Sequence, residues 1–287
     1  MTDSQDLGGL PLERRRDGQQ WILDFLIKQT GREQNWEPDG RRFPPEVKSH
    51  DMIPRVMHRR GQHKERLARA AERVGHGETA VALYYEAVED YRWAQHAIYT
   101  DDDREKIYIH GCLEACYDRI IELSTDRIER VDVELDGQTL SGLLHLAPGE
   151  GRRPAVVFCP GMDMTKEAFP PPGRNPYGKR GMHVLSIDGP GQGVSNLRKI
   201  RVTEDNYEAA GRKFIDLLVA RPEVDASKIG VSGRSMGSFW GMRIAAVDDR
   251  VAAVATSVAT YGTKTSIFER ASPRFKQVFN VHGGNSR

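Results

Sequence analysis

The stretch that decides the fold is Lys228-Ile-Gly-Val-Ser-Gly-Arg-Ser-Met-Gly237. Its first half, Lys228–Ser232, has apolar side chains at alternate positions, Ile229 and Val231, and is predicted to be a strand. Its second half leads into Ser235–Val247, where apolar residues recur at the spacing of a helix. Since Gly233 and Gly237 flank Ser235, the chain can turn sharply between the two elements. The sequence therefore predicts a strand–turn–helix unit with Ser235 at the turn.

Gly233–Gly237 has the pattern G-x-S-x-G. The pentapeptide alone is a weak signal, because an ordinary glycine-rich turn can produce it. Its position between a strand and a helix favours a nucleophile elbow, in which the serine oxygen is exposed at the carboxyl edge of a sheet. The backbone N–H of the next residue, Met236, would then point at a developing oxyanion. We therefore predict that Ser235 is a catalytic nucleophile.

Strand and helix patterns alternate on both sides of this unit. A hairpin turn at Asp136-Gly137 joins two alternating apolar segments, as expected for antiparallel strands. Further strands are expected at 154–159, 183–187 and 251–258, and helices at 165–169 and 204–220. An antiparallel start followed by such alternation predicts an α/β fold: a mostly parallel sheet with helices on both faces.

The N-terminal part has a different pattern. Residues 1–16 form a polar tail, and residues 17–125 are expected to be helical. A long amphipathic helix is predicted over 80–97, and Asp101–Asp103 place acids at the start of another helix. A helical-repeat protein would fit this part, but no second copy recurs at a fixed period. We predict three parts: a tail at 1–16, a helical domain at 17–125 and an α/β domain at 126–287.

Two loops follow predicted strands. The loop Cys159–Asp163 lies where a second oxyanion donor is expected, and this donor is the N–H of either Met162 or Asp163. The loop Asp188–Gly193 is rich in glycine but does not match G-x-G-x-x-G, because Val194 occupies the last glycine position. We interpret it as a shaped loop near the active site and not as a dinucleotide cradle.

Together, these features resemble an α/β-hydrolase. The helical stretch around Tyr84–Gln95, the segment Met162–Glu167 and the D-G-P-G-Q-G loop are similar to a narrower group. That group includes 2,6-dihydroxypseudooxynicotine hydrolase, polyketide-shortening hydrolases of fungal pigment pathways and fermentation–respiration switch esterases. The resemblance implies a serine hydrolase that acts beside a carbonyl, on a carbon–carbon bond or an ester. It also implies a helical cap over the site, and Tyr84, Tyr85, Tyr91 and Trp93 are candidates to line an aromatic pocket, although each also fits helix packing.

The sequence does not identify the other two members of a catalytic triad. In this architecture the acid and then the histidine follow the serine along the chain. His282 is the histidine that follows Ser235, and the acids after it are Asp248, Asp249 and Glu269. No strand is expected to position His282, so a terminal residue without catalytic role is the alternative. We therefore expect a C-terminally shortened copy of a longer hydrolase, whose sheet lacks its last strands.

Composition narrows the function classes. The chain has 42 Lys and Arg against 41 Asp and Glu, a net charge of +1, which argues against a nucleic-acid binder. Three cysteines imply no disulfide framework, and Cys112 and Cys116 lack further metal ligands nearby. No signal peptide or membrane span is recognisable, so we expect a cytoplasmic protein without membrane partners.

The expectation is thus a hydrolase without cofactor or metal that takes a small carbonyl substrate, aromatic compounds included. A homodimer is one assembly that the resemblance suggests. The competing hypothesis is a non-catalytic or inactive binding protein that keeps the fold and lacks the triad.

Overall fold

The computed structural model describes residues 49–100 and 102–257. It also describes short pieces at 6–7, 10–11, 34–35, 42–44, 46–47, 276, 279–280 and 282–283. In the N-terminal pieces, two-residue strands pair antiparallel: β1 (Asp6–Leu7) with β2 (Leu10–Pro11), and β3 (Gln34–Asn35) with β4 (Arg42–Phe43). The rest of the predicted tail, and the first part of the predicted helical region, lie outside the described residues.

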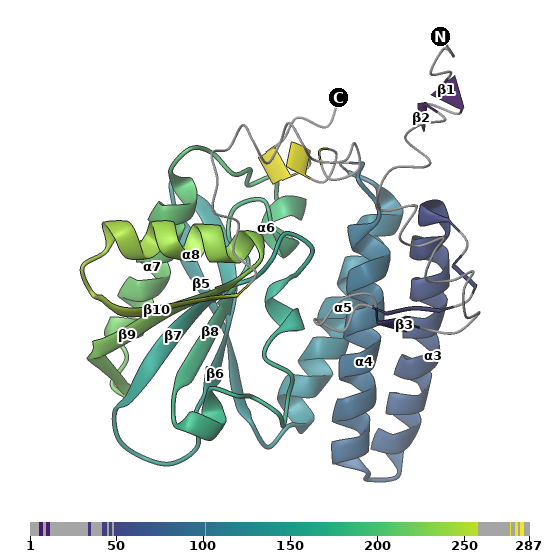
Figure 1. Ribbon diagram of the computed structural model, residues 1–287. Helices are drawn as coiled ribbons and strands as arrows, with labels where there is room; N and C mark the ends of the chain where they lie inside the picture. The colour runs from purple at the N-terminus through teal and green to yellow at the C-terminus, as the bar shows by residue number, and fades with distance from the viewer. Residues whose placement is uncertain are drawn as a thin grey trace.

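A six-stranded sheet forms the centre of the described α/β part (Figure 1). Its strands are β5 (Arg127–Leu135), β6 (Gln138–Leu146), β7 (Arg153–Cys159), β8 (His183–Ile187), β9 (Val224–Arg234) and β10 (Val251–Ser257). The order across the sheet is β10-β9-β7-β8-β6-β5. The first two strands pair antiparallel, β6 pairs antiparallel with β8, and the pairs β7–β8, β7–β9 and β9–β10 are parallel. The expected antiparallel start and parallel remainder are confirmed.

Two helices, α7 (Asn206–Val219) and α8 (Met236–Val247), cover one face of this sheet. Phe214 and Ile215 of α7 and Ile244 of α8 are fully buried in one apolar cluster with side chains of the sheet. Removing these large apolar surfaces from water is the main force that holds the layer together.

Three long helices stand side by side next to the sheet (Figure 1): α3 (Ile53–Arg73), α4 (Gly77–His96) and α5 (Arg104–Leu123). They share a core of their own, which Ile128 of β5 and Leu143 of β6 join from the sheet. Asp103 caps α5, because its carboxylate accepts from the N–H groups of Glu105 at 2.8 Å and Lys106 at 3.1 Å. The helical part passes into the sheet between Leu123 and Arg127, where the sequence placed a boundary at 125/126.

The helix expected over 165–169 is wrong in type and length. The structure has a single 3₁₀ turn, η2 (Lys166–Ala168), at this place. Three prolines, Pro170–Pro172, follow directly, and a proline cannot donate the N–H that a continuing helix needs. In the other short segments, η1 (His50–Met52), η3 (Gly178–Arg180) and α6 (Gly193–Leu197), the chain turns between longer elements. Within the described residues, none of the helices has the length and hydrophobicity that crossing a bilayer requires.

Candidate active site

Ser235 lies at the sharp turn between β9 and α8, as the sequence predicts. Its backbone has φ 54° and ψ −123°, a strained conformation for a residue with a side chain. The turn is tight: a Cβ on Gly237 would overlap the carbonyl oxygen of Cys159 at the end of β7. The Ser235 N–H donates to the Ser257 carbonyl at 2.8 Å, so the end of β10 also holds the turn. Since Met236 begins α8, its N–H belongs to the unpaired donors of a helix N-terminus.

The loop after β7 lies against this turn. A Cβ built on Gly161 would lie 3.4 Å from the Ser235 Cβ and 3.2 Å from the Arg234 carbonyl oxygen. Met162 and Asp163 follow in the same loop. Asp163 lines one cavity together with Ser235, whereas Met162 lines a second, smaller cavity. Arg92 of α4 also reaches this loop, where its guanidinium donates to the Asp163 carbonyl oxygen at 2.7 Å.

Ser235 opens into a cavity of about 900 Å³ between the helical part and the sheet. This volume suits a medium-sized organic molecule. Three aromatic residues line it, together with charged and apolar side chains: Tyr85, Trp93, Phe169, Met57, Arg60, Lys64, Glu86, Glu89, Asp90, Arg92, Asp163, Met164, Ala168, Pro171, Arg174 and Arg234. Of the four aromatic candidates in the helical part, Tyr85 and Trp93 line the cavity. The other two, Tyr84 and Tyr91, are fully buried in the helical core, so their pocket assignment is wrong.

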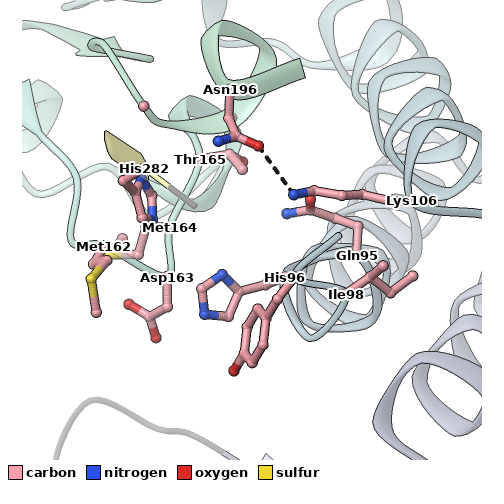
Figure 2. Close-up of a pocket in the computed structure, with 13 residues that line it drawn as sticks. Gln95, His96, Ile98, Lys106, Met162, Asp163, Met164, Thr165, Asn196 and His282 are labelled. Carbon is pink, nitrogen blue, oxygen red and sulfur yellow. Dashed lines mark hydrogen bonds between the residues drawn. The ribbon is translucent and has the colours of Figure 1, made fainter. Parts of the chain in front are cut away.

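A second, small cavity of about 30 Å³ shares Asp163 and Met164 with the first. In Figure 2 the Asp163 carboxylate and the His96 ring face each other, and His282 lies on the side of Met162. Burial lowers the pKa of His96 to about 3, although Asp163 acts in the opposite direction. Burial also lowers the pKa of His282 to about 4, against backbone hydrogen bonds at Gly191 and Met162. Both rings are therefore held neutral.

Among the residues that the structure describes, no side chain is hydrogen-bonded to the Ser235 hydroxyl. The described piece that holds His282 lies beside Gly191, a position that the sequence did not predict: a Cβ on Gly191 would lie 3.1 Å from the His282 Cβ. Asp248 follows the C-terminal end of α8, whereas Ser235 precedes its N-terminal end. The Asp248 carboxylate pairs with Arg250 at 2.6 Å. Glu269 lies outside the described residues.

Over the described ranges, no group of three or more His, Cys, Asp and Glu side chains could hold a metal ion.

A buried charge cluster supports the far end of the 159–167 loop. The Lys166 ammonium lies 2.6 Å from Glu167 and 3.1 Å from Asp188, and the three side chains are at most 1% exposed. Burial alone would raise the pKa of Glu167, but Lys166 and His110 outweigh it and lower that pKa to about 2. Burial raises the pKa of Asp188, and the negative charge of Glu167 acts in the same direction, against the attraction of Lys166. One buried cation therefore compensates two carboxylates.

The sequence did not single out Arg92 and Gln192, which contact the 159–167 loop, or Lys166, which belongs to it. The family likeness of Met162–Glu167 and of Asp188–Gly193 included two of these residues without giving them a role. The contacts of Lys166 and Gln192 form only when the fold brings the 159–167 loop and the Asp188–Gly193 loop together. Arg92 gave no sequence signal, since a charged residue on an amphipathic helix is ordinary.

Comparison with known proteins agrees with this geometry. A family model described as "Esterase FrsA-like" matches residues 63–269. The curated α/β-hydrolase xenA of Xenoacremonium sinensis is 29% identical over 232 residues, which cover 76% of this chain and 52% of that protein. The 2,6-dihydropseudooxynicotine hydrolase of Paenarthrobacter nicotinovorans is 33% identical over 138 residues, which cover 48% of this chain and 36% of that protein. The chain thus spans about half the length, or less, of these curated relatives.

Among solved structures, the 2,6-dihydroxy-pseudo-oxynicotine hydrolase superposes with a TM-score of 0.71 at 24% identity. The match covers 81% of this chain and 64% of that one. At this identity the likeness establishes the fold, an α/β-hydrolase sheet with a helical cap.

Proposed function

We propose that this chain, which belongs to the FrsA-like esterase family, carries the nucleophile of a serine hydrolase that acts on a small carbonyl compound. The observation that carries the proposal is the strained turn at Ser235, φ 54°, at the wall of the 900 Å³ cavity. Strained backbone persists where surrounding structure enforces it, and such sites are often functional. The family match supports a hydrolase, and the residues at the cavity support this particular serine.

In the proposed reaction, the Ser235 hydroxyl attacks the carbonyl carbon of the substrate. The N–H of Met236 and an N–H of the Met162–Asp163 segment stabilise the negative oxygen of the tetrahedral intermediate. The leaving group departs with a proton, and water then releases the acyl group from Ser235. A general base must take the hydroxyl proton, and we assign none of the described residues to that step.

Two classes of bond fit this chemistry. An ester is consistent with the family, and its alkoxide leaving group departs readily once protonated. A carbon–carbon bond needs a leaving carbanion that an aromatic ring or second carbonyl stabilises. Tyr85, Trp93 and Phe169 line the cavity and would pack on an aromatic substrate of either class.

A fluorophosphonate probe tests the nucleophile. The protein should be labelled at Ser235, and Ser235→Ala should abolish labelling while the melting curve is unchanged. Ser238→Ala is not a suitable control, because the Ser238 hydroxyl donates to the Gly233 carbonyl at 2.8 Å within the turn. Ser227→Ala, in β9 at an exposed position, is the better control and should label normally.

A substrate pair then separates the two bond classes. A p-nitrophenyl ester and an aryl 1,3-diketone present the same acyl carbon with an oxygen or a carbon leaving group. Release of p-nitrophenol alone identifies an esterase, and cleavage of the diketone identifies a carbon–carbon hydrolase. A folded protein that binds such ligands but is neither labelled nor active would favour the competing function, a non-catalytic binding protein. The lack of a described base bonded to Ser235 is the observation behind that alternative.

A further inference from the structure

We propose that Gln192 is a positioning residue that orients the loop after β7, so that the N–H of Met162 is the second oxyanion donor. The inference rests on the proposed function of Ser235 and deepens it. The sequence left the donor open between Met162 and Asp163, and it gave the D-G-P-G-Q-G loop no role beyond a shape.

Gln192 makes two hydrogen bonds to the loop. Its amide Nε2 donates to the carbonyl oxygens of Pro160 and Gly161, each at 2.9 Å, and the residue is 2% exposed. Carbonyl oxygens can only accept, so the group that faces both of them must be the NH₂ of the amide. The side chain therefore uses both its donor hydrogens to hold two successive peptide groups of one loop.

The oxygen of the Gln192 amide accepts a further hydrogen bond. The Tyr207 hydroxyl of α7 donates to Gln192 Oε1 at 2.5 Å, and Tyr207 is fully buried. The Tyr207 ring stacks on Trp240 of α8, with centroids 4.8 Å apart and planes within 8°. A Cβ on Gly189 would overlap the Tyr207 ring, so that glycine lets the tyrosine come close to the loop. The contacts thus run from Trp240 of α8, through Tyr207 and Gln192, to the loop after β7.

Fixing the carbonyl of Gly161 also fixes an N–H. In a trans peptide the C=O of one residue and the N–H of the next point in opposite directions. Since the Gly161 carbonyl points at Gln192, the Met162 N–H points away from Gln192. The Gly161 carbonyl also accepts from the Met164 N–H at 3.0 Å, which closes a turn and keeps this orientation. Gly161 itself lies against Ser235. Since Gly161 separates the two, we infer that the Met162 N–H, on the side away from Gln192, faces the Ser235 hydroxyl.

The same glycine-rich loop holds the far end of the 159–167 segment. The Asp188 carboxylate accepts from the Lys166 N–H at 2.8 Å, from its ammonium at 3.1 Å and from the Val194 N–H at 2.9 Å. Gln192 and Asp188 thus hold the two ends of one segment. This arrangement meets the requirement that an oxyanion site be organised before the charge develops.

Labelling kinetics test the role of Gln192. Gln192→Leu keeps the approximate volume and removes both donors, and we expect the fluorophosphonate to label Ser235 about 100-fold more slowly, as for the loss of one oxyanion donor. With an ester substrate the loss should fall on kcat and leave KM within a factor of two. Tyr207→Phe leaves the NH₂ in place and should slow labelling only several-fold. Gln138→Leu, at an exposed position of β6, is the matched control and should react like the wild type.

Hydrogen exchange distinguishes this role from general stability. In Gln192→Leu, exchange in a peptide over 160–168 should accelerate at least tenfold, because the Gly161 carbonyl loses its anchor, while exchange in α4 and α7 stays unchanged. Unchanged exchange in 160–168, or acceleration throughout the protein, would overturn the proposal. If the wild type is not labelled at all, the proposed function fails, and the exchange result still decides whether Gln192 orients the loop. In a crystal structure of the labelled protein, the phosphonyl oxygen should lie within hydrogen-bond distance of the Met162 nitrogen; contact with the Asp163 nitrogen instead would refute the donor assignment.

Discussion

The two sides of Ser235 differ in how many contacts the described residues make there. On one side, the 159–167 loop is bonded to Gln192, Asp188 and Arg92, all of which are buried. On the other side, no described side chain is bonded to the Ser235 hydroxyl, and β10 at the edge of the sheet is largely exposed. The side that would stabilise negative charge is therefore rigid. On the side that would supply a general base, no described residue is assigned to that role.

This difference reflects what each side of the site requires. The charge-stabilising side needs backbone N–H groups, which every residue carries, so the fold supplies them when neighbouring strands are paired. A general base needs one particular side chain at one particular place. The rigid side is therefore the first to test.

The largest expected effect is at the buried charge cluster. Lys166→Met removes the cation that compensates Asp188 and Glu167, two carboxylates that are fully buried. Breaking such a cluster leaves buried charge without a partner and should lower the free energy of unfolding by about 3–5 kcal/mol. Urea denaturation followed by circular dichroism measures the change.

Lys199→Met is the matched control, because Lys199 pairs with Asp102 at 2.7 Å on an exposed surface. An exposed pair contributes little, so this variant should stay within about 1 kcal/mol of the wild type. Equal losses in the two lysine variants would show that the 159–167 loop is not held by its buried charges.

The next effect is expected at the turn itself. Gly237→Ala places a Cβ against the Cys159 carbonyl oxygen, which is backbone and can yield only if β7 and α8 separate. Such overpacking should cost about 1–3 kcal/mol and, by moving the Met236 N–H, should slow labelling of Ser235. Gly111→Ala, in α5 with no atom within 4 Å of the added carbon, should instead stabilise the protein by about 0.5–1 kcal/mol. A destabilised Gly111→Ala, or a normally labelled Gly237→Ala, would contradict this account of the turn.

The sequence was sufficient for features that depend on local pattern. The turn at Gly233–Gly237 and the hairpin at Asp136-Gly137 carry their conformation in their own residues, and both were predicted. The 3₁₀ turn at Lys166–Ala168 was predicted as a helix, although the prolines that prevent its continuation, Pro170–Pro172, stand in the sequence itself. Gln192 had no readable role, since its partners Pro160 and Tyr207 are distant in sequence and meet it only in the folded sheet.

A pH dependence is expected from a histidine beside the buried charge cluster. Burial lowers the pKa of His110 to about 4, well below the usual value near 6.5 that an unfolded chain retains. Between these values the unfolded state binds a proton that the folded state does not. Stability is therefore complete above pH 6.5 and falls as the pH drops towards 4, by about 1.4 kcal/mol per pH unit for this residue.

His110→Gln removes that proton and should flatten the stability profile between pH 6.5 and 4.5, by about 2 kcal/mol across the range. Urea midpoints at several pH values measure the slope. His63→Gln, at an exposed position of α3, is the control and should keep the slope of the wild type. A parallel profile for His110→Gln would mean that His110 is protonated in the folded protein, and the charge cluster would then hold a second cation.

The smallest effect tests how far the helical part supports the rigid side. The Tyr85 hydroxyl of α4 donates to the Ala168 carbonyl oxygen at 2.7 Å, at the end of the loop that Gln192 and Asp188 hold. Tyr85→Phe removes this bond and should lower the free energy of unfolding by about 1 kcal/mol. Because Gln192 and Asp188 hold the loop independently, labelling of Ser235 should slow less than threefold. Tyr108→Phe, at a position 57% exposed, should change neither quantity. A tenfold slower labelling in Tyr85→Phe would mean that the loop depends on the helical part for its orientation and not on the glycine-rich loop of the sheet.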